Sequence, residues 1–66
     1  MMRYSLVVDG KEVAREVQKE LLVDMLDSLE KGKGLMWLSV YRGDCLNFYG
    51  DFKKVAVLKK FIEDFK

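Results

Sequence analysis

The chain has 66 residues, is 50% hydrophobic and 35% charged, and carries a formal net charge of +1. A chain of this length has room for one small core, so we expect a single α+β domain over residues 1–66. Its near neutrality excludes a global electrostatic attraction to nucleic acid or anionic lipid, and its single cysteine excludes an internal disulfide framework.

The first expected element is a strand over residues 2–8, where apolar and polar side chains alternate. Asp9 and Gly10 favour a turn that ends it. From residue 11 to residue 31 the apolar side chains instead recur about every 3.6 residues, so we expect one long amphipathic helix that ends at Gly32. The apolar stripe of this helix comprises Val13, Ala14, Val17, Leu21, Leu22, Met25, Leu26 and Leu29.

A β-hairpin is expected next, with strands over residues 35–42 and 45–49 joined by a type II′ turn at Gly43 and Asp44. Both faces of this hairpin carry apolar residues. We expect the face under the helices to hold Trp37, Tyr41, Leu46 and Phe48. A break and a helix cap are then predicted at residues 50–51, followed by a second amphipathic helix over residues 52–65.

These elements predict a β-α-β-β-α fold. The economical arrangement is a three-stranded antiparallel sheet in the order 1-3-2, with both helices on one face. No internal repeat is visible in the sequence, and no segment has the composition of a linker.

The N-terminus and the apolar segments bear on where the protein works. Residues 1–4 lack the apolar core and cleavage site of a signal peptide, and no apolar run approaches the roughly 20 residues of a membrane-spanning helix. Together with the lone cysteine, these features predict a cytoplasmic protein that has no membrane partner.

Residues suited to catalysis are scarce. The chain has no histidine, and the glycines around Lys33 lack the spacing of a phosphate-binding loop. Four acidic residues at four-residue spacing could suggest a cation site, but Arg15 and Lys19 lie within reach of them, so a salt-bridged helix face is the better account. These four are Glu12, Glu16, Glu20 and Asp24. Cys45 follows the hairpin turn with Arg42 opposite, a cation that could make a thiol reactive, and an inert structural thiol is the alternative. The sequence therefore predicts a protein that is not an enzyme and uses no cofactor and no metal.

The expected open face of the sheet is the leading candidate for function. It would expose a set of apolar side chains, namely Val7, Met36, Leu38, Val40 and Tyr49. Because a patch of this kind commonly marks a binding site, we expect the protein to bind a protein partner or to bind itself as a homodimer.

A nucleic-acid-binding module is the alternative. A stacking surface for bases could be supplied by a ring of the hairpin, from Tyr41, Tyr49 or Trp37. Four basic residues of the last helix could contact phosphates: Lys53, Lys54, Lys59 and Lys60. The near-neutral total charge makes this alternative the weaker of the two.

The order and sizes of the expected elements are similar to those of the DinI family, small bacterial and phage proteins of β-α-β-β-α fold that modulate the RecA recombinase filament. The likeness rests on residues 2–8, 38–42 and 46–50. It implies the fold and a small regulatory protein that acts by binding, and the short chain is consistent with a phage or mobile-element origin. The C-terminal helix of that family is strongly acidic, whereas the helix here is basic, so only the fold and the general regulatory role carry over.

Overall fold

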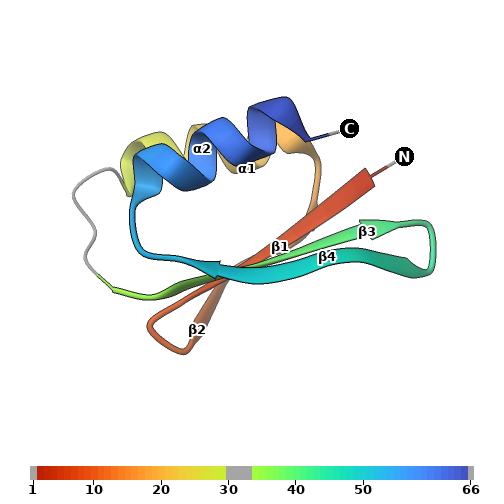
Figure 1. Ribbon diagram of the computed structural model, residues 1–66, viewed down its shortest axis with the longest axis horizontal. Coiled ribbons are helices and arrows are strands. Elements are labelled where there is room, and N and C mark those ends of the chain that lie inside the picture. The colour runs from red at the N-terminus through yellow and green to blue at the C-terminus, as the bar shows by residue number, and fades with distance from the viewer. Residues whose placement is uncertain (1, 30–33, 66) are drawn as a thin grey trace.

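The computed structural model describes residues 2–29 and 34–65 of the chain. It is an α+β domain with one four-stranded antiparallel sheet and two helices (Figure 1). The elements are β1 (Met2–Val8), β2 (Lys11–Val17), α1 (Lys19–Ser28), β3 (Met36–Arg42), β4 (Cys45–Phe52) and α2 (Val55–Asp64). The predicted class and the predicted first strand are confirmed, whereas the prediction of three strands is wrong.

The additional strand is β2, where the sequence predicted the first half of a helix. Asp9 and Gly10 have positive φ angles of 52° and 82°, as in the type I′ turns that join antiparallel strands. β2 contains two register irregularities against β1, and such bulges break the alternation of a strand. Val13, Ala14 and Val17 consequently all pack in or against the core, and their spacing imitates one side of a helix.

The sheet order is β2-β1-β3-β4, so the predicted order 1-3-2 is also wrong. The turn after β1 places β2 against one side of that strand. The chain then passes through α1 and returns as β3 on the other side of β1, pairing from Met2 opposite Arg42 to Val8 opposite Met36. The last strand can therefore pair only with the outer side of β3, and β2 and β4 become the two edges of the sheet.

The second hairpin forms where it was predicted. Gly43 has a φ of 63°, and Asp44 does not have a positive φ, which fits the predicted type II′ turn. β4 is longer than expected, because Gly50 and Asp51 continue the ladder by pairing with β3. The predicted break and helix cap at these two residues are therefore wrong, and α2 begins only at Val55.

The first helix is correspondingly shorter than expected. α1 begins at Lys19 and ends at Ser28, and the backbone N–H of Leu29 donates to the carbonyl of Leu26 at 3.0 Å. The predicted helix end at Gly32 lies outside the described residues.

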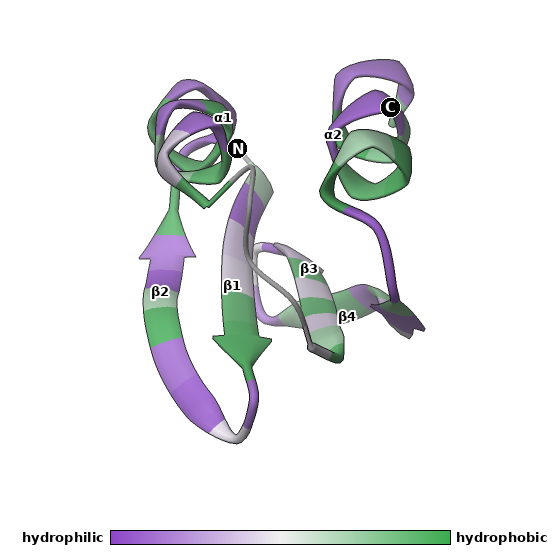
Figure 2. Cartoon of the chain, turned by 90° about the vertical axis from the view of Figure 1, so that its left-hand side faces the viewer, coloured by the Kyte–Doolittle hydropathy of each residue, from purple (hydrophilic) through white to green (hydrophobic). Residues whose placement is uncertain are grey.

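Both helices cover the same face of the sheet, as predicted (Figure 2). The core lies between these two layers, and it is built from apolar side chains of every element except β4. These buried residues are Tyr4, Leu6, Ala14, Leu22, Leu26, Met36, Leu38, Val40, Val55, Leu58 and Ile62.

The element order also reveals an internal repeat that the sequence does not show. Each half of the chain runs strand, strand, helix, and β1 pairs antiparallel with β3 at the middle of the sheet. Ser5 lies opposite Ser39 at the centre of this pairing, so the halves are related by an approximate two-fold axis. The core has the same approximate two-fold symmetry, because Leu22 in α1 and Leu58 in α2 occupy matching positions and are both fully buried.

Candidate interaction surface along the fourth strand

The open face of the sheet differs from the predicted one. Met36, Leu38 and Val40 are 3%, 0% and 0% exposed, so these candidate partner-binding residues lie in the core under the helices. Only Val7 and Tyr49 of the predicted set face away from the helices. Because β3 is apolar on both sides, alternation alone could not decide which side the helices cover.

The aromatic residues predicted for the covered face lie instead on the open one. Trp37 stacks on Tyr49 with ring centroids 5.3 Å apart and an interplanar angle of 21°. Leu46 pairs with Tyr41 after a bulge in β4, so it also faces outward, and it is 53% exposed. Phe48 alone of the predicted set remains on the helix side, paired with the buried Val40.

The other half of the open face is polar. Arg3 on β1 forms an ion pair with Glu16 on β2 at 3.1 Å, and the backbone N–H of Glu16 donates to the hydroxyl of Ser5 at 2.9 Å. The apolar part of the open face is therefore confined to β3, β4 and the neighbouring Val7.

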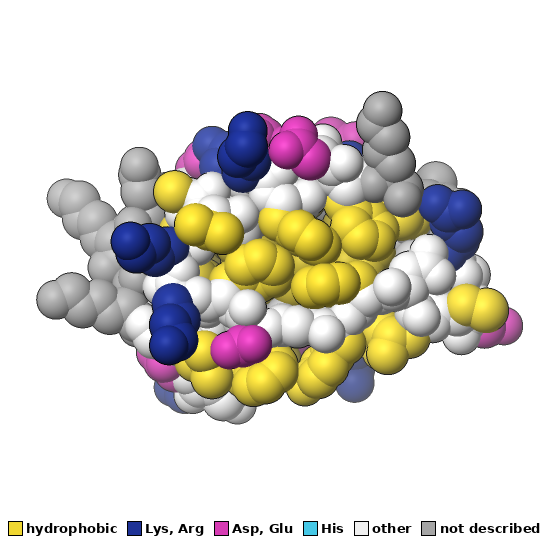
Figure 3. Space-filling model, viewed as in Figure 1, with side chains coloured by type: hydrophobic (Ala, Val, Ile, Leu, Met, Phe, Trp, Pro, Cys, Tyr) yellow, Lys and Arg dark blue, Asp and Glu magenta, His cyan; other side chains and the backbone are white. Residues whose placement is uncertain are grey.

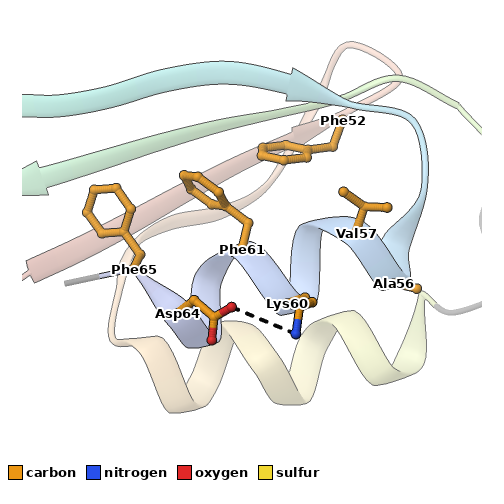
Figure 4. Close-up of a pocket in the computed structure, with 7 residues that line it drawn as sticks. All are labelled: Phe52, Ala56, Val57, Lys60, Phe61, Asp64 and Phe65. Atoms are coloured by element: carbon orange, nitrogen blue, oxygen red, sulfur yellow. Dashed lines mark ion pairs between the residues drawn. The ribbon is translucent and has the colours of Figure 1, made fainter.

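A second apolar surface lies on the helix side of β4. The space-filling view shows hydrophobic side chains gathered across the side that carries α2 and β4 (Figure 3). At its centre is a hollow of about 690 Å³ between the end of β4 and the outer side of α2 (Figure 4). We call it the phenylalanine groove; it is lined by Phe52, Ala56, Val57, Lys60, Phe61, Asp64 and Phe65.

The rings of the phenylalanine groove pack against one another. Phe61 lies 5.2 Å from Phe52 and 5.3 Å from Phe65 between ring centroids. Phe48 supports them from the sheet, with its ring centroid 4.5 Å from that of Phe61. Aromatic pairs at these separations add stability beyond their buried area, so the groove has a defined shape.

Gly50 explains why Phe48 can reach that position. A Cβ atom at Gly50 would stand 2.7 Å from the tip of the Phe48 ring, closer than packed atoms approach. The ring therefore lies across the glycine on the same face of β4. The residue that the sequence indicated as a helix boundary is instead the place where an aromatic ring covers the strand.

The rim of the groove is charged on one side and apolar on the other. Lys60 and Asp64, one helical turn apart, form an exposed ion pair whose Nζ and Oδ2 atoms are 3.9 Å apart. Val57 stands 55% exposed near the start of α2. A solvent-facing aliphatic side chain beside open aromatic rings is typical of a surface that is covered in a complex.

Both apolar surfaces flank the same edge strand. The phenylalanine groove lies on the helix side of β4 and the Trp37–Tyr49 stack lies on its open side. The sequence analysis missed the groove because it assigned Phe52 to a helix. Phe48 and Phe52 stand an even number of residues apart in one strand, and Phe61 and Phe65 stand one helical turn apart, so the spacing could have indicated it.

The four lysines of the alternative hypothesis do come together. Lys53, Lys54, Lys59 and Lys60 line a second hollow between α1 and α2. Its acidic neighbours reduce its positive charge, since Asp27 accepts a hydrogen bond from Lys59 at 2.7 Å and Glu63 lines the same hollow. This hollow lies in the helix layer, whereas the stacked Trp37 and Tyr49 lie on the other face, so phosphate and base contacts would not share one surface.

The Tyr4 phenol is a buried titratable group of the core. Burial, and secondarily the negative charge of Glu20, raise the pKa of this phenol above its ordinary value of about 10. Its hydroxyl is buried and has no hydrogen-bond partner among the described residues. Because a phenol with a raised pKa keeps its proton at neutral pH, Tyr4 is a structural group of the core.

The remaining candidates for chemistry stay isolated. Cys45 is exposed and pairs with Arg42 across the turn, as the predicted hairpin required. Within residues 2–29 and 34–65 no group of three or more acidic or cysteine side chains could hold a metal ion. None of the helices in those residues is both long enough and apolar enough to cross a membrane.

Comparisons of the chain with protein-family models, with curated proteins and with solved structures found no match. They leave the DinI resemblance untested, and the observed β-β-α-β-β-α order differs from the order on which that resemblance rested.

Proposed function

We propose that this protein is a small non-enzymatic interaction module that binds an extended segment of a protein partner along β4. The observation that carries the proposal is that one edge strand has an apolar surface on both of its faces. Binding a partner at such an edge can regulate either protein, and it requires no catalytic group.

Strand addition suits this edge for two reasons. An edge strand presents unpaired backbone N–H and C=O groups, which a further strand can satisfy. Side chains of an added strand alternate between the two faces of the sheet. Those on one face would meet the phenylalanine groove, and those on the other would meet Tyr49 and Leu46, so apolar residues at successive positions could all be buried.

The chemistry of β4 favours this use. Asp51 is its only charged residue, and the strand has no lysine and no proline. Natural sheets commonly protect an exposed edge with such residues to prevent unwanted pairing. The absence of this protection, on an eight-residue strand, supports a role in binding.

Backbone NMR of the labelled protein tests the proposal. The probe is a synthetic peptide of eight alternating Val and Thr residues with one lysine at each end. We expect its addition to shift the amide resonances of β4 and of the groove residues, and to leave those of β2 unchanged. Shifts centred on β2, or none up to millimolar peptide at a protein concentration where the chain is monomeric, would contradict the proposal.

A matched pair of variants sharpens this experiment. Tyr49→Lys places a cation on the open face of β4, and Glu12→Lys places one on the open face of β2. We expect Tyr49→Lys to weaken peptide binding and Glu12→Lys to leave it unchanged. Equal effects of the two variants would indicate nonspecific association.

Nucleic-acid binding is the second candidate function, supported by the convergence of four lysines in the hollow between α1 and α2. Binding of a labelled single-stranded oligonucleotide should then weaken as salt rises, with a slope that decreases when Lys53 and Lys54 are replaced by Gln. Binding that is absent at low salt, or that does not respond to these replacements, would exclude this role.

A further inference from the structure

We infer that the segment bound along β4 is β4 of a second copy, so that two chains form a two-fold symmetric dimer with a continuous eight-stranded antiparallel sheet. The inference rests on the proposed function and names its partner. The sheet of one chain has four strands, and β4 is one of its two edges.

The first argument is that the surface is complementary to itself. A two-fold axis perpendicular to the sheet pairs β4 antiparallel with its copy and keeps all helices on one side of the enlarged sheet. The phenylalanine groove of one copy then faces that of the other, and Val57, Phe61 and Phe65 become a shared core. An apolar groove of this kind needs an apolar occupant, and the same chain supplies one.

Charge complementarity between the two copies of α2 also supports the dimer. The two copies of α2 run antiparallel across the axis, so the basic and acidic ends of the groove rim exchange places. Lys60 of one copy then lies toward Asp64 of the other. Within one chain the Lys60 and Asp64 side chains are exposed, and their Nζ and Oδ2 atoms are 3.9 Å apart, which is long for an ion pair. Each side chain can therefore pair with the opposite charge of the other copy, and no like charges meet.

The third argument comes from β4 itself. In a register centred on Tyr49, the Asp51 carboxylate of one copy lies opposite Asn47 of the other, where an amide can donate to it. The two Asp51 carboxylates, the only charges in the paired strands, stay apart. On the open face the two Trp37–Tyr49 stacks come side by side across the axis.

Sedimentation equilibrium of the full chain over a concentration series tests the dimer directly. We expect the mass to approach twice the 7.7 kDa of the chain as concentration rises. A mass that stays at one chain up to millimolar concentration would overturn the inference.

A matched pair of variants locates the interface. Val57→Glu and Leu21→Glu each place a carboxylate at the third residue of a helix, where it favours the helix dipole and should preserve the fold. Both positions are about half exposed, at 55% and 51%. We expect Val57→Glu to weaken dimerisation by roughly thirtyfold or more, and Leu21→Glu, which lies on α1, to leave it unchanged. A dimer that is insensitive to Val57→Glu would overturn the proposed interface.

A charge exchange at the groove rim provides a second variant test that leaves the apolar side chains of the groove unchanged. Lys60→Asp and Asp64→Lys should each weaken the dimer by about two- to fivefold, and the double exchange should restore it. If the double variant weakens the dimer by as much as the effects of the two single variants added together, Lys60 and Asp64 do not pair across the axis.

Failure of the dimer and failure of the interaction module can be told apart. If the chain stays monomeric but the alternating Val and Thr peptide shifts the β4 resonances, the self-association is wrong and strand addition stands. If neither the chain nor the peptide associates with β4, both proposals are wrong.

Discussion

The two edges of the sheet have the same position in the fold and opposite chemistry. β2 carries charged residues at Lys11, Glu12, Arg15 and Glu16 and has two register irregularities. β4 carries one charge and has one irregularity. Charges and bulges are the usual protection of an exposed edge, so the domain blocks pairing at β2 and leaves it open at β4.

The approximate two-fold axis makes this difference informative. The two halves of the chain repeat the order strand, strand, helix. Folding therefore gives no reason for the edge strands β2 and β4 to differ in chemistry. The ion pair between Arg3 and Glu16 occupies the open face of the first half, whereas the Trp37–Tyr49 stack occupies that of the second. We attribute the divergence of the second half to binding.

The largest expected effect separates the two faces of the second hairpin. Leu38→Asp should abolish folding, because the side chain is fully buried and an unpaired carboxylate in an apolar core costs several kcal/mol. Tyr49→Asp, on the open face and 61% exposed, should leave a folded domain with weakened association. Circular dichroism with urea denaturation measures the folding of both variants, and sedimentation equilibrium measures the association of Tyr49→Asp. A folded Leu38→Asp protein would contradict the assignment of faces.

A smaller effect is expected at Gly50. Gly50→Ala should lower the free energy of unfolding by about 1–3 kcal/mol, because the new methyl group displaces the Phe48 ring. Gly10→Ala in the first hairpin should cost about 1 kcal/mol for a different reason, the positive φ at that position. Only Gly50→Ala should change the ring resonances of the phenylalanine groove in NMR spectra. Identical spectral changes in the two variants would show that Gly50 does not shape the groove.

Tyr4 gives a prediction about pH. The folded-state pKa of its phenol is raised by burial and by Glu20, so the folded protein holds this proton more tightly than the unfolded chain does. Its contribution to stability is therefore complete below about pH 10 and is lost as the pH rises from there toward the folded-state pKa. Tyr4→Phe should remove this decline and raise stability at neutral pH by about 1 kcal/mol, since the buried hydroxyl is unpaired. Urea denaturation at several pH values between neutrality and pH 11 measures both effects, and a decline that persists in Tyr4→Phe would have another origin.

The smallest effect on stability concerns the protected edge. Arg15 and Glu12 form an exposed ion pair at 3.4 Å, and pairs of this kind contribute less than about 1 kcal/mol. Replacing both by Thr should change the unfolding free energy little and yet increase association, because it removes charge from β2. Light scattering of the double variant at high concentration measures this. A variant no more associated than the original chain would show that these charges do not protect the edge.

The sequence was sufficient for the class, the first strand and the second hairpin, because alternation and turn residues are local signals. It failed at β2, where two bulges turn Val13, Ala14 and Val17 toward the core and produce a helical spacing. The Asp9-Gly10 dipeptide was the opposing signal, since it is typical of a tight hairpin. If the turn signal of Asp9-Gly10 had been given more weight than the helical spacing after residue 10, the second strand would have been predicted.

The candidate site was harder to predict for a different reason. Leu38 and Trp37 are neighbours in a strand that is apolar on both faces, and only the tertiary packing decides which of them the helices cover. Of the predicted open-face residues, Val7 and Tyr49 are confirmed in position and Met36, Leu38 and Val40 are wrong.

Amide hydrogen exchange at two protein concentrations tests the central claim most directly, because it compares both edges in one unmodified sample. The account predicts that amides of β4 exchange more slowly at high concentration and that those of β2 exchange at the same rate at both. Slower exchange in β2, or rates in β4 that do not depend on concentration up to the millimolar range, would contradict it.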